Sequence, residues 1–188
     1  MMRYFIGFIV TLGLIIILIL LLVTGGGSKS KTSTAPKTLT SYVDTDAEVR
    51  LLVDGPVNAD QIHQRELITV GRYNVTFQQM QGYDNAIVNT QSYPSTRDAY
   101  AAFLHSLQHA GFTNVKTDPK LADERGYCPL GNRYVFELRQ NDADIERYWA
   151  TSCGKPKTFP GNTDMVITLF KAQIPDYDTL TQNINIAF

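Results

Sequence analysis

The pattern of hydrophobic and polar positions divides the chain into an apolar start, a polar stretch and a long mixed region. From Tyr4 to Val23 no charged side chain occurs over 20 positions. At about 1.5 Å per residue, a helix of that length spans roughly 30 Å, the hydrocarbon thickness of a bilayer. The run is longer than the apolar part of a cleaved signal peptide and lacks an A-x-A site at its end. We therefore predict a transmembrane helix over residues 4–23, preceded by a cytoplasmic stub at residues 1–3.

The next stretch, TGGGSKSKTSTAPKTLTS, is rich in Gly, Ser, Thr and Lys and poor in apolar residues. This composition is typical of a flexible, solvated linker. We predict a tether over residues 24–45 and one folded domain over residues 46–188, which is a usual length for a single domain.

Alternating apolar and polar positions predict strands in the first half of this domain. The segments are EVRLLVDG, RELITV, NVTFQQMQ and AIVNTQSY, and GRYN and GYDN between them are turn-like. A short further strand is predicted near TNVK, at residues 113–116.

The spacing changes to a helical one after residue 93. PST at 94–96 is a helix start signal and Gly111 a stop signal. Between them one apolar face repeats at i, i+3, i+4 and i+7: Tyr100, Phe103, Leu104 and Leu107. A second helix, TDMVITLFKAQ, is capped by Asn162 and ended by Pro175, and DYDTLTQN predicts one further turn. The expected fold is α+β: a two-layer domain with a mainly antiparallel sheet and about two helices on one face.

Two cysteines, Cys128 and Cys153, enclose the stretch NRYVFELRQNDADIERYWATS. Its two alternating halves predict a hairpin with NDAD as a four-residue turn. In that register Gln140 lies opposite Ile145 and Phe136 lies opposite Trp149, which would fill the core.

In the same register Cys153 falls opposite Asn132 and not opposite Cys128. A β-turn with Pro129 at its second position would fold Cys128 back beside Gly131. We therefore predict a Cys128–Cys153 disulfide, worth about 3 kcal/mol by chain-entropy arguments. Two reduced, buried cysteines in a cytosolic domain are the alternative.

The charges beside the apolar run do not settle its orientation. Arg3 precedes it, whereas Lys29, Lys31 and Lys37 follow it, and this bias favours an outer N-terminus. Long domains, however, translocate largely regardless of charge, and disulfides persist in oxidising compartments. We predict a single-pass protein of the cell membrane with a cytoplasmic N-terminus and an extracytoplasmic C-terminal domain.

Net charge excludes one class of partner. From Ser41 onward the chain has 13 Lys and Arg against 18 Asp and Glu, a balance of −5. Nucleic-acid recognition needs a basic face, so we expect no nucleic-acid partner. The expected contacts are the lipid bilayer through residues 4–23 and a protein or cell-envelope polymer.

His105 and His109 are the weak candidates for a metal site, since two histidines four apart on a helix can share a metal. The stretch is HSLQH without the glutamate of HExxH, and two solvated histidines on an exposed helix face are the favoured interpretation. There is no GxSxG, CxxC or calcium-loop spacing. The sequence indicates no catalytic residues and no cofactor.

Two aromatic residues lie in predicted loops: Tyr83 in MQGYDN and Phe159 in KPKTFPGN. Because aromatic residues are enriched in interfaces, both are candidates for partner binding.

The motifs CPLGNRYVFEL, RYWATSC and LFKAQIPDY, together with the layout of stub, helix, tether and single-disulfide domain, resemble uncharacterised single-pass anchored proteins of small-genome candidate-phylum bacteria. The resemblance covers mainly the last 60 residues. It implies a membrane location and no particular activity.

We expect an anchored extracytoplasmic domain that binds a protein or an envelope polymer without catalysis. Two alternatives stay open. One is an envelope hydrolase or metal-dependent enzyme that uses His105, His109 and an acidic loop residue. The other is an accessory subunit of a membrane complex, recognised through its helix.

Overall fold

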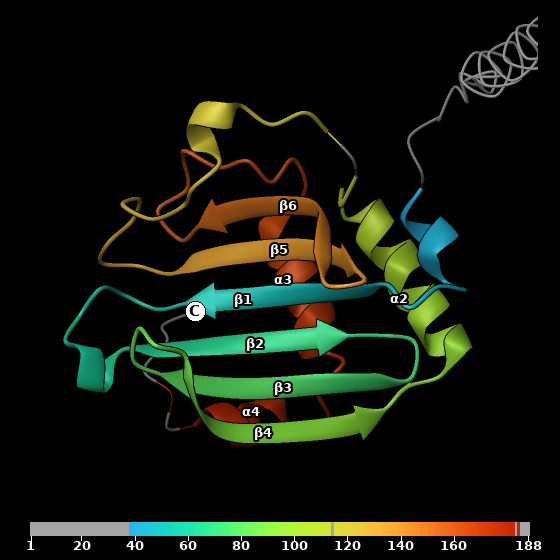
Figure 1. Cartoon of the computed structure of the whole chain (residues 1–188), viewed down its shortest axis with the longest axis horizontal. Coiled ribbons are helices and arrows are strands. Elements are labelled where there is room, and N and C mark those ends of the chain that lie inside the picture. Colours follow the sequence, from blue (N-terminus) through green and yellow to red (C-terminus); the bar gives the residue numbers. More distant parts are fainter. Residues whose placement is uncertain (1–37, 114, 183, 185–188) are drawn as a thin grey trace, which may run out of the picture. The chain divides into compact units, whose positions relative to one another are not determined.

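Six antiparallel strands form one sheet in the computed structural model, which describes residues 38–113, 115–182 and 184 (Figure 1). The strands are β1 (Glu48–Asp54), β2 (Gln64–Val70), β3 (Asn74–Gln81), β4 (Ala86–Pro94), β5 (Arg133–Gln140) and β6 (Ala143–Thr151). Their order across the sheet is β4-β3-β2-β1-β5-β6. The first four strands form a meander of neighbours, and β5 then pairs with β1.

Three helices cover one face of this sheet and lie behind it in Figure 1: α2 (Arg97–His109), α3 (Thr163–Lys171) and α4 (Tyr177–Thr181). Short 3-10 turns are η1 (Leu39–Tyr42), η2 (Asp60–Ile62) and η3 (Pro119–Leu121). The predicted α+β class with an antiparallel sheet is confirmed.

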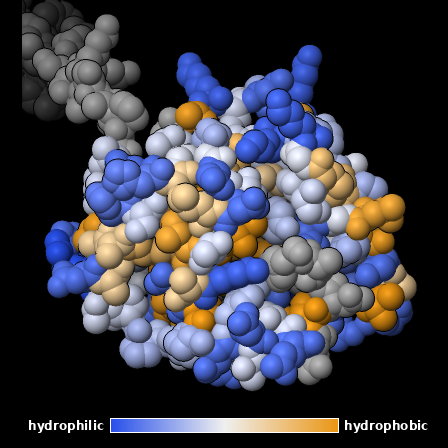
Figure 2. All heavy atoms as spheres, turned by 180° about the vertical axis from the view of Figure 1, so that it is seen from behind, coloured by the Kyte–Doolittle hydropathy of each residue, from blue (hydrophilic) through white to orange (hydrophobic). Residues whose placement is uncertain are grey.

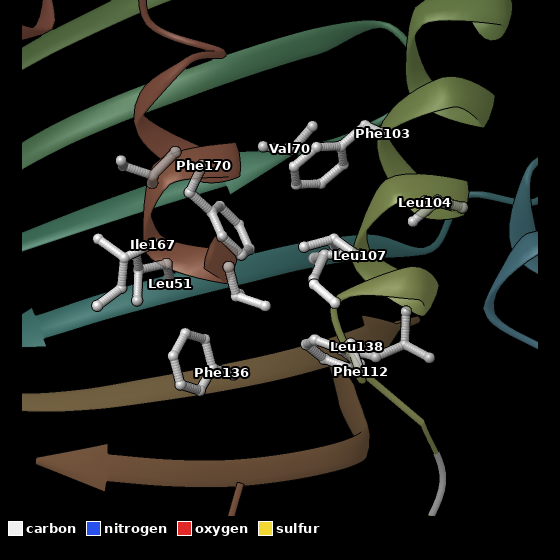
Figure 3. Packing of buried hydrophobic residues seen from close by; sticks show 14 of the residues in the cluster. Leu51, Val70, Phe103, Leu104, Leu107, Phe112, Phe136, Leu138, Ile167 and Phe170 are labelled. Atoms are coloured by element: carbon white, nitrogen blue, oxygen red, sulfur yellow. The ribbon is translucent and has the colours of Figure 1, made fainter. Parts of the chain in front are cut away.

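Alternation in the strands sets which side chains meet the helices. In β1, Val49, Leu51 and Val53 are buried while the residues between them are partly exposed. Figure 3 shows apolar residues of α2 and α3 packing over the sheet side chains. Those labelled are Phe103, Leu104 and Leu107 of α2, Ile167 and Phe170 of α3, Phe112, and Leu51, Val70, Phe136 and Leu138 of the sheet. Each fully buried large side chain of this kind stabilises the fold by about 1.5–3 kcal/mol.

The two long helices begin where the sequence predicts. The Thr96 hydroxyl accepts a hydrogen bond from the Ala99 amide at 3.2 Å, and the Asn162 side chain accepts one from the Met165 amide at 3.0 Å. Each cap satisfies an amide that has no partner inside its helix. Gly111, just beyond α2, has a positive φ of 92° and lies against Gly161, where a Cβ atom would collide.

The predicted register of the β5–β6 hairpin is wrong. Gln140 pairs with Ala143 and Phe136 pairs with Tyr148, because the turn is the two residues Asn141 and Asp142. Both have positive φ, 51° and 61°, as in the tight turns that match strand twist. A bulge at Leu138/Arg139 then shifts the rest of the ladder by one residue.

The strand predicted near TNVK is also not formed. Thr113, Val115 and Lys116 have no regular secondary structure, and Asn114 lies outside the described residues. The segment is instead held by a side chain, since the Tyr148 hydroxyl donates to the Thr113 carbonyl at 3.0 Å and accepts from the Val115 amide at 3.2 Å.

The folded part starts earlier than the predicted boundary at residue 46. Leu39, Tyr42 and Val43 are buried in the core, and η1 packs against α2. The predicted membrane helix, and the tether up to residue 37, lie outside the described residues. None of the helices within 38–113, 115–182 and 184 has the length and apolar character needed to cross a bilayer.

Candidate binding site at one end of the sheet

Exposed hydrophobic side chains gather at the end of the sheet where β1 and β3 finish and β2, β4 and β5 begin. We call this the apolar end. Of the ten exposed large hydrophobic residues in the described part of the chain, six lie here: Val57, Ile62, Tyr83, Ile87, Val88 and Leu130. Leu130 is 88% exposed. In Figure 2, which shows the helix-covered face, hydrophobic residues reach the surface at the right margin, the side that corresponds to this end.

A charged cluster beneath this surface holds three strands together. Asp54, at the end of β1, accepts from His63 Nε2 at 2.9 Å and from Arg133 Nη2 at 2.8 Å, and Arg65 Nε lies 3.3 Å away. Arg133 also donates to the Gly55 carbonyl at 2.9 Å. Arg133 and His63 are buried, and the Asp54 side chain is partly buried, with 13% of its surface exposed.

His63 is held at both ring nitrogens by oxygen acceptors. Nε2 faces the Asp54 carboxylate, and Nδ1 lies 3.1 Å from the Pro56 carbonyl oxygen. Both ring nitrogens therefore face oxygen atoms of this chain, and the buried ring supports its neighbours.

Tyr83 lies on the outer side of His63. The two rings are stacked with centroids 4.0 Å apart and an interplanar angle of 14°. The Tyr83 hydroxyl donates to the Asn58 carbonyl at 2.9 Å, and its amide donates to Asp60 Oδ1 at 2.8 Å. One ring face and both ends of the residue are therefore fixed, yet Tyr83 is 47% exposed. The predicted loop aromatic is an immobilised ring that presents its other surface to solvent.

The disulfide belongs to the same end. The Sγ atoms of Cys128 and Cys153 are at bonding distance, with the Cα atoms 5.7 Å apart. The Gly131 amide donates to the Cys128 carbonyl at 3.1 Å, which is the turn predicted around Pro129. The Val57 amide donates to the Pro129 carbonyl at 2.7 Å, so the stapled loop and the β1–β2 loop are joined.

Phe159 is not an exposed loop aromatic, and that interpretation is wrong. The residue is 1% exposed, and its ring lies 4.5 Å from the Phe136 ring and 6.0 Å from the Phe112 ring. The cause is the path of the chain after Cys153, which returns along β6 so that the Phe159 amide donates to the Trp149 carbonyl at 2.9 Å. Phe159 is part of the core and carries no partner surface.

Trp149 is buried, but on the sheet face opposite the helices. It pairs with Val135, stacks on Tyr127 at 5.1 Å, and its indole N–H donates to the Leu121 carbonyl at 2.6 Å. The loop that contains η3 therefore covers this part of the second face. Arg147 anchors the same loop through Glu124, at 2.7 Å.

His105 and His109 lie on the outer side of α2, both exposed, with ring centroids 4.5 Å apart. No group of three or more metal-ligating side chains is found among residues 38–113, 115–182 and 184. The structure thus brings these two histidines together without a third ligand beside them.

A second buried charge lies on the helix face of the sheet. The Tyr177 hydroxyl of α4 donates to Glu66 Oε2 at 2.8 Å. Burial raises the pKa of Glu66, and it lowers the pKa of the nearby Lys171. Glu66 is fully buried, so the contact fixes α4 to β2 and offers no group to a ligand.

Sequence reasoning found Tyr83 and the disulfide but missed Asp54, Arg65 and Arg133. Each is a charged residue at a strand end, where a solvated position is the ordinary interpretation. Arg65 pairs with Asp54 across the β1–β2 hairpin, whereas Arg133 reaches Asp54 only because β5 lies beside β1, a pairing across more than half of the domain that no local pattern indicates.

Comparison of the chain with protein-family models, with curated protein sequences and with solved structures gives no match. The interpretation of the apolar end rests on its geometry alone.

Proposed function

We propose that this chain is a membrane-anchored, extracytoplasmic binding domain and that the apolar end contacts a protein partner. The observation that carries the proposal is the fixed, half-exposed ring of Tyr83 among exposed aliphatic residues. An ordered aromatic residue loses little conformational entropy when a partner covers it, and Tyr is enriched among residues that dominate binding energy.

The composition of the apolar end favours a protein over a carbohydrate polymer. Its aliphatic members are Val57, Ile62, Ile87, Val88 and Leu130. Burying such side chains gains about 25 cal/mol per Å² only against apolar groups, and a polar saccharide chain offers fewer of these than a protein surface does.

The entry point of the chain agrees with an anchored domain. η1 lies beside α2, at the end of the sheet where β1 begins, and β1 runs from there to the apolar end (Figure 1). Anchorage itself is proposed from the apolar run at residues 4–23.

Site-specific photo-crosslinking in native membranes tests the binding surface. A photoreactive amino acid replaces Leu130 in the full-length chain, and the matched control replaces Tyr73, which is 73% exposed at the opposite end of the sheet. We expect one discrete protein adduct from position 130 and none from position 73. Adding Tyr83→Ala should reduce the adduct at least tenfold, since loss of a dominant interface residue costs about 2 kcal/mol or more. Equal adducts at both positions, or no effect of Tyr83→Ala, would overturn the proposal.

Location is tested separately by non-reducing peptide mapping of the full-length protein from its own membrane. We expect the N-terminal peptide together with a linked Cys128–Cys153 pair. Free thiols at both positions would place the domain in a reducing compartment and contradict the extracytoplasmic assignment.

A further inference from the structure

The edge strand β4 is open along its length. It spans nine residues, Ala86–Pro94, and seven of them are exposed while Asn89 and Tyr93 are partly buried. In the described part of the chain β4 pairs with β3 on one side and with no strand on the other. Such an edge offers a row of free backbone donors and acceptors to another strand.

β4 also lacks the charges that usually protect an edge. Its sequence, AIVNTQSYP, contains no Asp, Glu, Lys or Arg. Two protective features are present: the β3–β4 pairing has a bulge at Gln79/Met80 of β3, and β4 ends in Pro94. Between them the segment Asn89–Tyr93 is regular, uncharged and unprotected.

The pairing with β3 shows which backbone groups point outward. The Ser95 amide donates to the Tyr73 carbonyl at 2.9 Å, and the register runs unbroken from Asn74 opposite Pro94 to Gln79 opposite Asn89. Because hydrogen-bonded and free positions alternate along an antiparallel strand, Gln91 and Tyr93 direct their backbone groups toward β3. Thr90 and Ser92 direct theirs to solvent.

We propose that β4 pairs with β4 of a second copy of this chain, antiparallel and centred on Gln91. Thr90 of each copy then lies opposite Ser92 of the other, and each pair exchanges both N–H to C=O bonds. Gln91 lies opposite Gln91, and Asn89 lies opposite Tyr93, so residues on the same face of the sheet meet. A twofold pairing places Gln91 opposite its own copy and brings like side chains close together around the axis, which is unfavourable for a charged strand and carries no such cost for this uncharged one.

The opposite edge limits the assembly to two copies. The backbone of Trp149 in β6 is already bonded to Thr158 and Phe159 of the same chain. Each copy therefore has one free edge of this kind in its described part, and pairing through β4 uses it. The product is a closed dimer with a continuous twelve-stranded sheet, six strands from each copy, and not a fibre.

Disulfide trapping in the full-length chain tests the register. In this register Gln91 and its counterpart form a non-hydrogen-bonded pair, so their Cα atoms would lie about 4.5 Å apart, within the disulfide range of about 4.4–6.8 Å. Gln91→Cys should give a covalent dimer on mild oxidation, at a yield at least tenfold above that of the control Met165→Cys, which is exposed on α3. Equal yields from the two variants would overturn the proposal.

A charge exchange at the same position separates this dimer from one formed through residues 4–23. Gln91→Lys alone and Gln91→Glu alone should each lower the dimer fraction, measured by light scattering of the detergent-solubilised full chain, because like charges then meet at the axis. Mixing the two variants should restore a mixed dimer. A dimer fraction unchanged by either substitution, or a mixture that stays as dissociated as its parts, would refute pairing through β4.

Discussion

The two edges of the sheet are finished in different ways. Along the second half of β6, the chain returns after the disulfide and bonds to the Trp149 backbone through Thr158 and Phe159. The first half of β6 carries a bulge and the charged residues Asp144, Glu146 and Arg147. Within the described residues no segment covers β4, and the sequence of β4 contains no charged residue. One edge is closed by the chain itself, and the other is left available for a partner.

The disulfide contributes to this difference between the edges. Cys153 lies two residues beyond the end of β6, and its bond to Cys128 fixes the start of the returning segment. Without that segment, β6 would expose backbone groups as β4 does. The difference between the two edges can be tested by substituting residues that hold the closed edge and by making matched substitutions elsewhere in the domain.

Phe159→Ala should have the largest effect on stability. The ring contacts Phe112 and Phe136 in the core, and removing a buried phenylalanine costs about 3–5 kcal/mol. Urea unfolding of the full-length chain measures the change. Tyr83→Ala, at the exposed loop aromatic, is the matched control and should cost roughly 1 kcal/mol for the lost stacking. Similar losses for both would mean that Phe159 does not anchor the returning segment.

Cys153→Ser should lower stability by about 3 kcal/mol under non-reducing conditions. The bond joins residues 25 apart in the sequence, and its loss gives the unfolded chain more freedom while the edge segment loses its fixed start. Thermal melting of the wild type and the variant measures the difference. With reductant present the two midpoints should coincide, and a difference that persists there would assign the effect to the substitution and not to the bond.

Thr158→Val tests the hydrogen bond at the closed edge. The Thr158 hydroxyl accepts from the Trp149 amide at 2.8 Å, and losing such a bond costs about 1 kcal/mol. Thr90→Val makes the same change on the open edge and should alter the unfolding free energy of the monomer by no more than about 0.5 kcal/mol. If Thr158→Val and Thr90→Val unfold at the same denaturant concentration, the proposed difference between the closed and the open edge is contradicted.

An effect confined to alkaline pH is expected from the Tyr148 hydroxyl proton near the closed edge. Burial, with a further contribution from Glu146, raises the pKa of Tyr148 to about 12. Since the unfolded phenol ionises near its ordinary value of 10, the unfolded state loses its proton first as pH rises, and stability falls between pH 10 and 12. Tyr148→Phe should make this part of the stability profile less steep, measured by urea unfolding at each pH, and the slope that remains comes from other buried tyrosines such as Tyr100 and Tyr177, whose pKa values burial also raises. An unchanged slope would show that Tyr148 is not the group responsible.

The elements that local sequence patterns determine were predicted well. Alternation in EVRLLVD and NVTFQQMQ, the cap at Thr96 and the stop at Gly111 all depend on neighbouring residues, and each matches the structure. The predictions that failed concern features that depend on distant contacts or on the conformation of a single turn. The β6 register followed from the positive φ values of Asn141 and Asp142, which the alternating pattern does not reveal.

The candidate site was predicted only in part, for the same reason. Tyr83 stands out because it is an aromatic residue in a predicted loop, and in the structure it is exposed as expected. Phe159 has the same local appearance, flanked by Pro and Gly, and is nevertheless buried because the returning segment carries it into the core. The partners of Asp54 come from β2 and β5 and from the loop before β2, so no window of the sequence contains the cluster.

The strand order also has a consequence for the order of folding. β1 to β4 are joined by short connections and can pair as soon as residues 48–94 are available, and β5 and β6 form a hairpin of their own. The β1–β5 ladder joins residues about 80 to 90 positions apart, since Asp54 pairs with Arg133 and Glu48 with Arg139. Closing so long a loop is entropically costly and slow. During synthesis the meander can therefore form first, and its β1 edge must wait, unpaired, for the last third of the chain to arrive.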